Sequence, residues 1–194
     1  MPSKKGKKLI LIQEDLLGEV LKITAREGKT VFAFTNEVFE QALKAYEMQT
    51  TPTELVEFYT LMKLEKDRGA MIVPIDLLNT LTKTSYDTDK EDLLQKWYEC
   101  GLWYGKYLSI KSQTENWFQV FEKLMRKCAW NISDFSITTQ GENVNVKCVS
   151  PSLTIESTEA FAKFLEGTMH SANYKIVKND RLKGMILLNF KKQE

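Results

Sequence analysis

The chain has 194 residues, enough for one ordinary domain or two small ones. Its 27 basic and 26 acidic residues give a net charge of +1, which excludes any argument for nucleic-acid binding from total charge. Cys100, Cys128 and Cys148 lie at least 20 residues apart, so we expect neither a disulfide framework nor a paired-cysteine metal clamp. No apolar run reaches the roughly 18 residues that cross a bilayer, and the first eight residues lack the apolar core of a signal peptide. We therefore expect a cytoplasmic protein without a membrane partner.

The chain begins with a basic arm. Lys4, Lys5, Lys7 and Lys8 fall within the first eight residues, and no acidic residue follows until Glu14. Arms of this kind suit the phosphate backbone of nucleic acids. A disordered N-terminus that only improves solubility is the alternative interpretation.

The next residues predict a strand and two helices. A short aliphatic strand is expected at residues 9 to 12, followed by an amphipathic helix that begins at Glu14 and ends at Gly28. Thr30 is a suitable N-cap for a second helix, in which apolar residues recur at spacings of three and four up to Tyr46. A lone strand has no partner within this segment, so we expect residues 9 to 46 to form an obligate dimer.

A helical connector is expected at residues 51 to 91. The pattern predicts a helix over residues 54 to 65, a brief strand at residues 70 to 73, and a helix over residues 76 to 83 that Pro74 opens. Residues 85 to 90 are polar and are predicted to be a linker.

Residues 92 to 194 are predicted to form an α+β domain. A long helix is expected over residues 91 to 109, and a second helix, capped by Thr114, runs to about Cys128. Alternating apolar residues predict one hairpin from residues 132 to 140 and 143 to 149, and another from residues 174 to 177 and 185 to 190, with a helix over 157 to 171 between them. The whole chain is therefore predicted to be α+β, with regions at residues 1–50, 51–91 and 92–194, and the segment from about Asp89 should fold alone.

No residue pattern indicates catalysis. The single histidine, His170, leaves no histidine pair for a metal and no partner for a nucleophile relay, and Gly28-Lys29-Thr30 lacks the upstream glycine of a phosphate-binding loop. We expect no enzyme activity, no catalytic residue, no metal and no cofactor.

An aromatic cluster lies on the predicted helix at residues 91 to 109. On a helix, Trp97, Gly101, Tyr104 and Gly105 share one face, and glycines four residues apart allow a second element or a ligand to approach closely. The pattern favours helix packing within the domain or a dimer, and a ligand pocket is the alternative.

The first 47 residues resemble the ribbon-helix-helix family of DNA-binding proteins. The resemblance is carried by residues 9 to 12, Leu16-Leu17 with Val20 and Ile23, Gly28-Lys29-Thr30, Asn36 to Phe39, and Ala42-Leu43. It implies that two chains intertwine, that their paired strands enter the major groove, and that the N-terminus of the second helix, here Lys29 and Thr30, grips phosphate. Because residues 9 to 12 carry no polar side chain, we expect mostly backbone-directed DNA binding.

Residues 92 to 194 resemble the 4-vinyl reductase domain, a relative of the TRAPP subunit fold found in archaeal and bacterial regulators. The shared features are Gly101, Tyr104-Gly105-Lys106, Phe164 to Gly167, and Gly184 before an apolar strand. The resemblance implies a small-molecule-binding domain. The cysteine-rich metal site often seen in that family has no counterpart in residues 179 to 190, so zinc is not predicted.

These observations predict a prokaryotic or archaeal transcription regulator. It would be a homodimer that binds DNA through Lys4, Lys5, Lys7, Lys8, Lys29 and Thr30, with a C-terminal domain that senses a small molecule, contacts a protein or oligomerises. The alternative is a dimeric scaffold or adaptor that binds another protein and no DNA.

Overall fold

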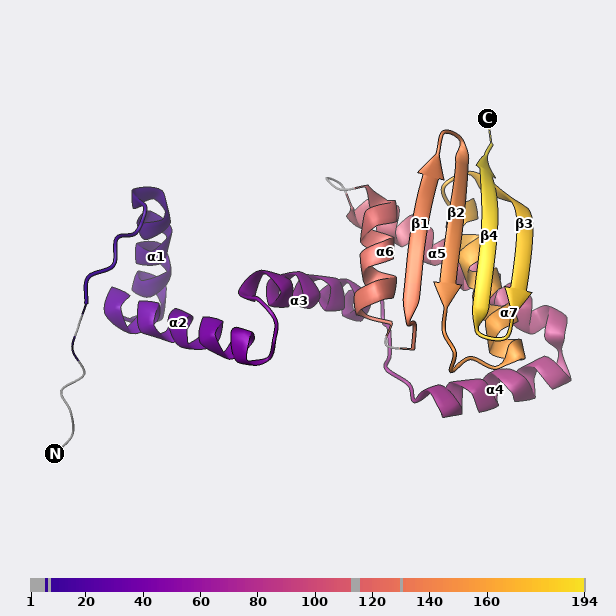
Figure 1. Ribbon diagram of the computed structural model, residues 1–194, viewed down its shortest axis with the longest axis horizontal. Coiled ribbons are helices and arrows are strands. Elements are labelled where there is room, and N and C mark those ends of the chain that lie inside the picture. The colour runs from indigo at the N-terminus through magenta and orange to yellow at the C-terminus, as the bar shows by residue number, and fades with distance from the viewer. Residues whose placement is uncertain (1–5, 7, 113–115, 130, 194) are drawn as a thin grey trace. The chain divides into compact units, whose positions relative to one another are not determined.

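The computed structural model describes residues 6, 8–112, 116–129 and 131–193. These residues form seven helices and one four-stranded antiparallel sheet, which confirms the α+β class (Figure 1). The chain divides into two compact units, Met1–Glu57 and Phe58–Glu194, and each is described by itself.

The N-terminal unit contains α1 (Glu14–Glu27), α2 (Val31–Glu47) and the first residues of α3 (Pro52–Asp67). Gly28 ends α1 in the left-handed conformation, with φ at 65°, and the amide of Lys29 donates to the carbonyl of Thr24. The Thr30 side chain then accepts a hydrogen bond from the Ala33 amide and caps α2. The predicted turn and both predicted helices are confirmed.

The prediction of a strand at residues 9 to 12 is wrong. In the structure these residues belong to no sheet, and regular structure begins with α1. A strand needs a neighbouring strand for its backbone hydrogen bonds, and the described part of this unit offers none. Exposure nevertheless differs along the segment, because Leu9 is 90% and Leu11 91% exposed while Ile10 is 56% exposed and Ile12 is half-buried.

The C-terminal unit places its helices on one face of the sheet. Its elements are the end of α3, α4 (Ile75–Thr88), α5 (Lys90–Lys111), α6 (Trp117–Lys127), β1 (Asp134–Gln140), β2 (Asn143–Val149), α7 (Ile155–His170), β3 (Tyr174–Leu182) and β4 (Met185–Lys192). The strand order is β1-β2-β4-β3, so the two hairpins meet between β2 and β4. Figure 1 shows α5 and α7 behind this sheet.

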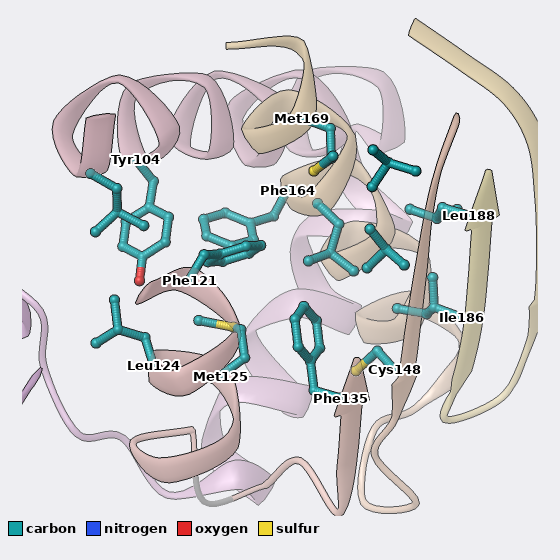
Figure 2. Close-up of a cluster of buried hydrophobic side chains, with 14 of the residues drawn as sticks. Tyr104, Phe121, Leu124, Met125, Phe135, Cys148, Phe164, Met169, Ile186 and Leu188 are labelled. Atoms are coloured by element: carbon teal, nitrogen blue, oxygen red, sulfur yellow. The ribbon is translucent and has the colours of Figure 1, made fainter. Parts of the chain in front are cut away.

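Alternation along the strands puts apolar side chains on the helix-covered face. Val144 pairs with Phe190, Val146 with Leu188, and Cys148 with Ile186, and all six are buried. The core that they complete with the helices is drawn in Figure 2, where Phe121, Phe135 and Met169 are among the labelled side chains. Both predicted hairpins are confirmed, although β3 continues to Leu182 and the second turn is tighter than predicted.

Two local predictions in the connector are wrong. Residues 70 to 73 form no strand, because no sheet edge pairs with them. Residues 85 to 88 are the last turn of α4 instead of a linker, and the Tyr86 hydroxyl anchors that turn by donating to Glu159 at 2.6 Å. Asn116 caps α6 by accepting from the Phe118 amide, while the predicted cap, Thr114, lies outside the described residues.

The end of α3 packs into the C-terminal unit. Leu61 is 5% exposed and belongs to the core, and the Tyr107 hydroxyl donates to the Leu64 carbonyl at 3.3 Å. On α4, the Asn79 side chain donates to the Ser152 carbonyl at 2.9 Å. Parts of the predicted connector are thus integrated into the C-terminal unit, which begins at Phe58.

Candidate nucleic-acid interface

Only some of the predicted DNA-binding residues lie in the described part of the chain. Lys4, Lys5 and Lys7 lie outside the described residues, and Lys8 is exposed. Lys29 and Thr30 lie in the turn between α1 and α2, next to the N-terminus of α2. The two predicted clamp residues therefore adjoin the positive end of a helix dipole.

Lys29 is already engaged by two carboxylates. Its Nζ lies 2.7 Å from Glu37 Oε2 and 3.1 Å from Glu27 Oε2. The hydrogen bond to Glu37, followed by that to Glu27, raises the pKa of Lys29, so the ammonium stays charged. A phosphate would have to displace these partners or share the lysine with them. Thr30 is similarly occupied by the cap that it forms for α2.

The N-terminal unit exposes an unusual amount of apolar side chain. Among the described residues of α1 and α2, the only buried ones are Thr24 and Ala45. The large apolar side chains of this unit that stay exposed in one chain are Leu9, Ile10, Leu11, Leu16, Leu21, Phe32, Val38, Phe39, Leu43, Tyr46, Met48, Leu55 and Val56. Exposed apolar surface of this extent is uncommon in soluble monomers.

The four residues of the predicted ligand pocket come together in a helix crossing. Gly101 and Gly105 on α5 face the backbone of α7, where a Cβ on Gly101 would overlap the Phe164 carbonyl oxygen. Gly167 on α7 faces α5 in the same way. Trp97 packs edge-on against Phe164 with ring centroids 6.5 Å apart. The glycines thus bring two helices into contact, which favours the packing interpretation over the pocket.

Tyr104, the fourth member of the set, is fully buried and hydrogen-bonded. Its hydroxyl donates to Glu65 Oε1 at 2.9 Å, and the Arg68 guanidinium lies 4.4 Å from the ring centroid while also binding Glu65. Burial, and secondarily the Glu65 charge, raise the pKa of Tyr104 well above 10. The phenol therefore remains protonated and serves to attach α3 to the core.

His170, Cys128 and Cys148 are held in packing positions, whereas Cys100 is exposed. The His170 Nδ1 lies 2.7 Å from the Tyr98 hydroxyl, and its Nε2 is buried without a partner among the described residues. Burial raises the pKa of Cys148 to about 12 and that of Cys128 to about 11, which disfavours their thiolates at neutral pH. Within the described ranges, no three His, Cys, Asp or Glu side chains gather to hold a metal ion.

A polar surface that the sequence patterns did not reveal lies on the open face of the sheet. Cross-strand pairing aligns Gln140, Asn143, Lys191 and Lys175 in one row across the four strands, and Thr138, Asn145, Asn189 and Lys178 in the next outward-facing row. Asn189 donates to Asn145 Oδ1 at 2.7 Å. Register brings these residues together from segments up to about 50 residues apart, which is why periodicity alone could not find them.

Compared with models of known protein families the chain matches none, and no curated protein matches it. None of the helices in the described part of the chain has the length and apolar character required to span a membrane.

Proposed function

We propose that the chain is a homodimeric DNA-binding transcription regulator. Its N-terminal unit dimerises and holds duplex DNA mainly by the backbone, and its C-terminal unit senses a small molecule, contacts a protein or mediates further association. The observation that carries the proposal is the combination, in one short unit, of a helix pair joined by a Gly28-Lys29-Thr30 turn, an apolar segment before it, and helices with large exposed apolar side chains.

Dimerisation supplies what the single chain lacks. The segment at residues 9 to 12 has unpaired backbone in one chain, and a second copy offers an identical segment with which to form a two-stranded ribbon. The same association covers exposed side chains such as Val38, Phe39 and Leu43. One contact then pairs the backbone of residues 9 to 12 between chains and removes apolar surface from water, and the removal of apolar surface provides the driving force.

The DNA-binding step is tested with the basic arm. Replacing Lys4, Lys5, Lys7, Lys8 and Lys29 by Ala in the full chain should weaken binding about equally on unrelated duplexes. The slope of log K against log salt should fall by roughly 0.9 for each phosphate that the altered chain no longer binds. Fluorescence anisotropy across a salt series measures both quantities. No binding of any duplex by the unaltered chain at low salt would contradict the proposal.

A dimeric scaffold that binds protein is the second candidate, and the environment of Lys29 favours it. Two carboxylates already neutralise this lysine, and the outward Leu9 and Leu11 offer no hydrogen-bonding group to a base edge. A chain that is dimeric in solution yet binds no duplex at low salt would support the scaffold.

A further inference from the structure

The end of the sheet beside the β1–β2 turn carries three lysines, of which only Lys191 has an ion-pair partner among the described residues. Lys175 on β3 and Lys191 on β4 are direct cross-strand partners, and Lys192 follows along β4. The three residues line one shallow hollow together with Glu142, Val177 and Gln193. Lys175 and Lys191 belong to the outward-facing row, whereas Lys192 pairs with the core-packed Tyr174 and reaches the hollow from the strand end. We call Lys175, Lys191 and Lys192 the sheet lysines.

Few carboxylates oppose the sheet lysines. Lys191 lies 3.8 Å from Glu142, whereas neither Lys175 nor Lys192 forms an ion pair within the described ranges. The nearby Lys178, by contrast, is held by Asp180 at 2.6 Å, and Lys147 by Asp134 at 2.8 Å. Like charges directly opposite each other on a sheet are destabilising. A bound anion would relieve this repulsion.

The face that carries Lys175 and Lys191 is open and rich in hydrogen-bond donors. Gln140 and Asn143 continue the row that contains Lys191 and Lys175, and both are exposed. The outward positions of all four strands carry no aromatic side chain on which an unpaired base could stack. Neighbouring strands lie about 4.8 Å apart, so lysines on adjacent strands reach oxygens of one phosphate or of consecutive phosphates.

The geometry points to this end of the sheet as a second contact surface for the phosphate backbone of duplex DNA. The inference rests on the proposed function, and it assigns to the C-terminal unit a part of the binding energy that does not depend on base sequence. Amides and ammonium groups on an open sheet suit phosphate oxygens, whereas single strands would require stacking side chains. Dimerisation through the N-terminal units would give each complex two such surfaces.

The test compares two triple variants of the full chain. In one variant Lys175, Lys191 and Lys192 are replaced by Gln, and in the matched control Lys63, Lys66 and Lys106 are replaced by Gln. The control lysines lie on α3 and α5, away from the strands, and the charge change is the same. On a duplex of unrelated sequence, the sheet variant should lower the slope of log K against log salt by about 1.8 to 2.7, as expected when two or three phosphates are no longer neutralised. The control should leave the slope near that of the unaltered chain.

A single substitution separates DNA contact from a structural role. Lys175→Glu puts opposite charges across the β3–β4 pair, so it should raise the melting temperature while it weakens DNA binding. A purely structural role predicts that the melting temperature and DNA affinity move together.

The outcomes distinguish this inference from the proposed function. If the sheet variant binds like its control while loss of the basic arm weakens binding, the sheet contact is overturned and the proposed function stands. If the sheet variant weakens binding and the arm variant does not, the sheet inference holds and the N-terminal site is overturned. Absence of duplex binding by the unaltered chain at low salt overturns both.

Discussion

At Gly101, hydrogen is the largest side chain that the α5–α7 crossing admits. A Cβ would overlap the Phe164 carbonyl oxygen, and backbone cannot move aside as a flexible side chain can. We expect Gly101→Ala to lower the free energy of unfolding by about 1 to 3 kcal/mol, the usual cost of overpacking. Urea unfolding followed by tryptophan emission measures this decrease.

Gly18 provides the control for that substitution. It lies inside α1, and a Cβ there meets no atom within 4 Å. Gly18→Ala should therefore leave the tryptophan-reported transition unchanged, since all four tryptophans lie between residues 97 and 130. Equal effects of the two substitutions would mean that the close contact with α7 does not limit residue 101.

The three thiols should differ sharply in reactivity. Burial raises the pKa of Cys148 to about 12 and that of Cys128 to about 11, whereas Cys100 is exposed on α5. Only the thiolate reacts with an aromatic disulfide reagent. At pH 8 the folded chain should release one equivalent of chromophore rapidly and the other two only after denaturation. Rapid release of three equivalents would show that the core around Cys148 opens readily.

At the scale of elements, Glu159 on α7 joins three neighbours. It accepts from Tyr86 of α4 at 2.6 Å and pairs with Lys90 of α5 at 3.1 Å and Arg181 of β3 at 3.5 Å. Burial raises the pKa of the carboxyl, but the hydrogen bonds and cations outweigh burial and lower it below 4.5. A lowered pKa in the folded chain stabilises at pH values above the unfolded pKa, and this contribution is lost as pH falls through the folded pKa.

Glu159→Gln should therefore matter most at neutral pH. The difference in free energy of unfolding between the unaltered chain and the variant should shrink as the pH is lowered below about 4.5, because the carboxyl is protonated first in the unfolded chain and then, at lower pH, in the folded chain. Urea midpoints measured across this range provide the comparison. A difference that does not change with pH would indicate that packing, and not charge, sets the role of Glu159.

The helices before residue 90 determine where a C-terminal fragment must begin. Leu61 of α3 lies in the core, and Tyr104 uses Glu65 as its acceptor. A fragment of residues 58–194 should melt cooperatively and at a higher temperature than a fragment of residues 89–194. The shorter fragment lacks Glu65, so the Tyr104 hydroxyl has lost its acceptor. Circular dichroism during heating compares them. Equal melting temperatures would mean that α3 and α4 add no stability to the core.

Elements with strong local patterns could be predicted from the sequence, and those set by distant partners could not. The α1–α2 turn follows from Gly28 and Thr30, and both hairpins follow from alternation of apolar residues. The strand expected at residues 9 to 12 is absent because its pairing depends on a second chain or another strand. The grouping of the sheet lysines could not be predicted from the sequence, because only the β3–β4 register places Lys175 opposite Lys191.

For the candidate site, the sequence predicts where residues lie along the helices and turns but not which partners they contact. The sequence predicts that Lys29 lies in the turn between the two helices. Its ion pair with Glu37 could not be predicted, because it depends on the direction of α2 after that turn. The shared face of Gly101 and Gly105 could be read from helical spacing, but whether a ligand or a helix occupies it depends on α7, some 60 residues later.

At the scale of the whole molecule, the two units differ in how complete they are. The C-terminal unit buries a core of its own, whereas the N-terminal unit leaves most of its large apolar side chains in water. The proposed function assigns the exposed apolar surface of the N-terminal unit to a second copy of the chain, and the basic residues beside it to DNA.

Sedimentation velocity of the full chain with a short fluorescent duplex at low salt tests this account most directly. We predict that the labelled DNA sediments as a complex of one duplex with two chains, and that the free protein at micromolar concentration sediments as a dimer. A monomeric protein that retains its full helicity, or DNA that sediments unbound, would contradict the account.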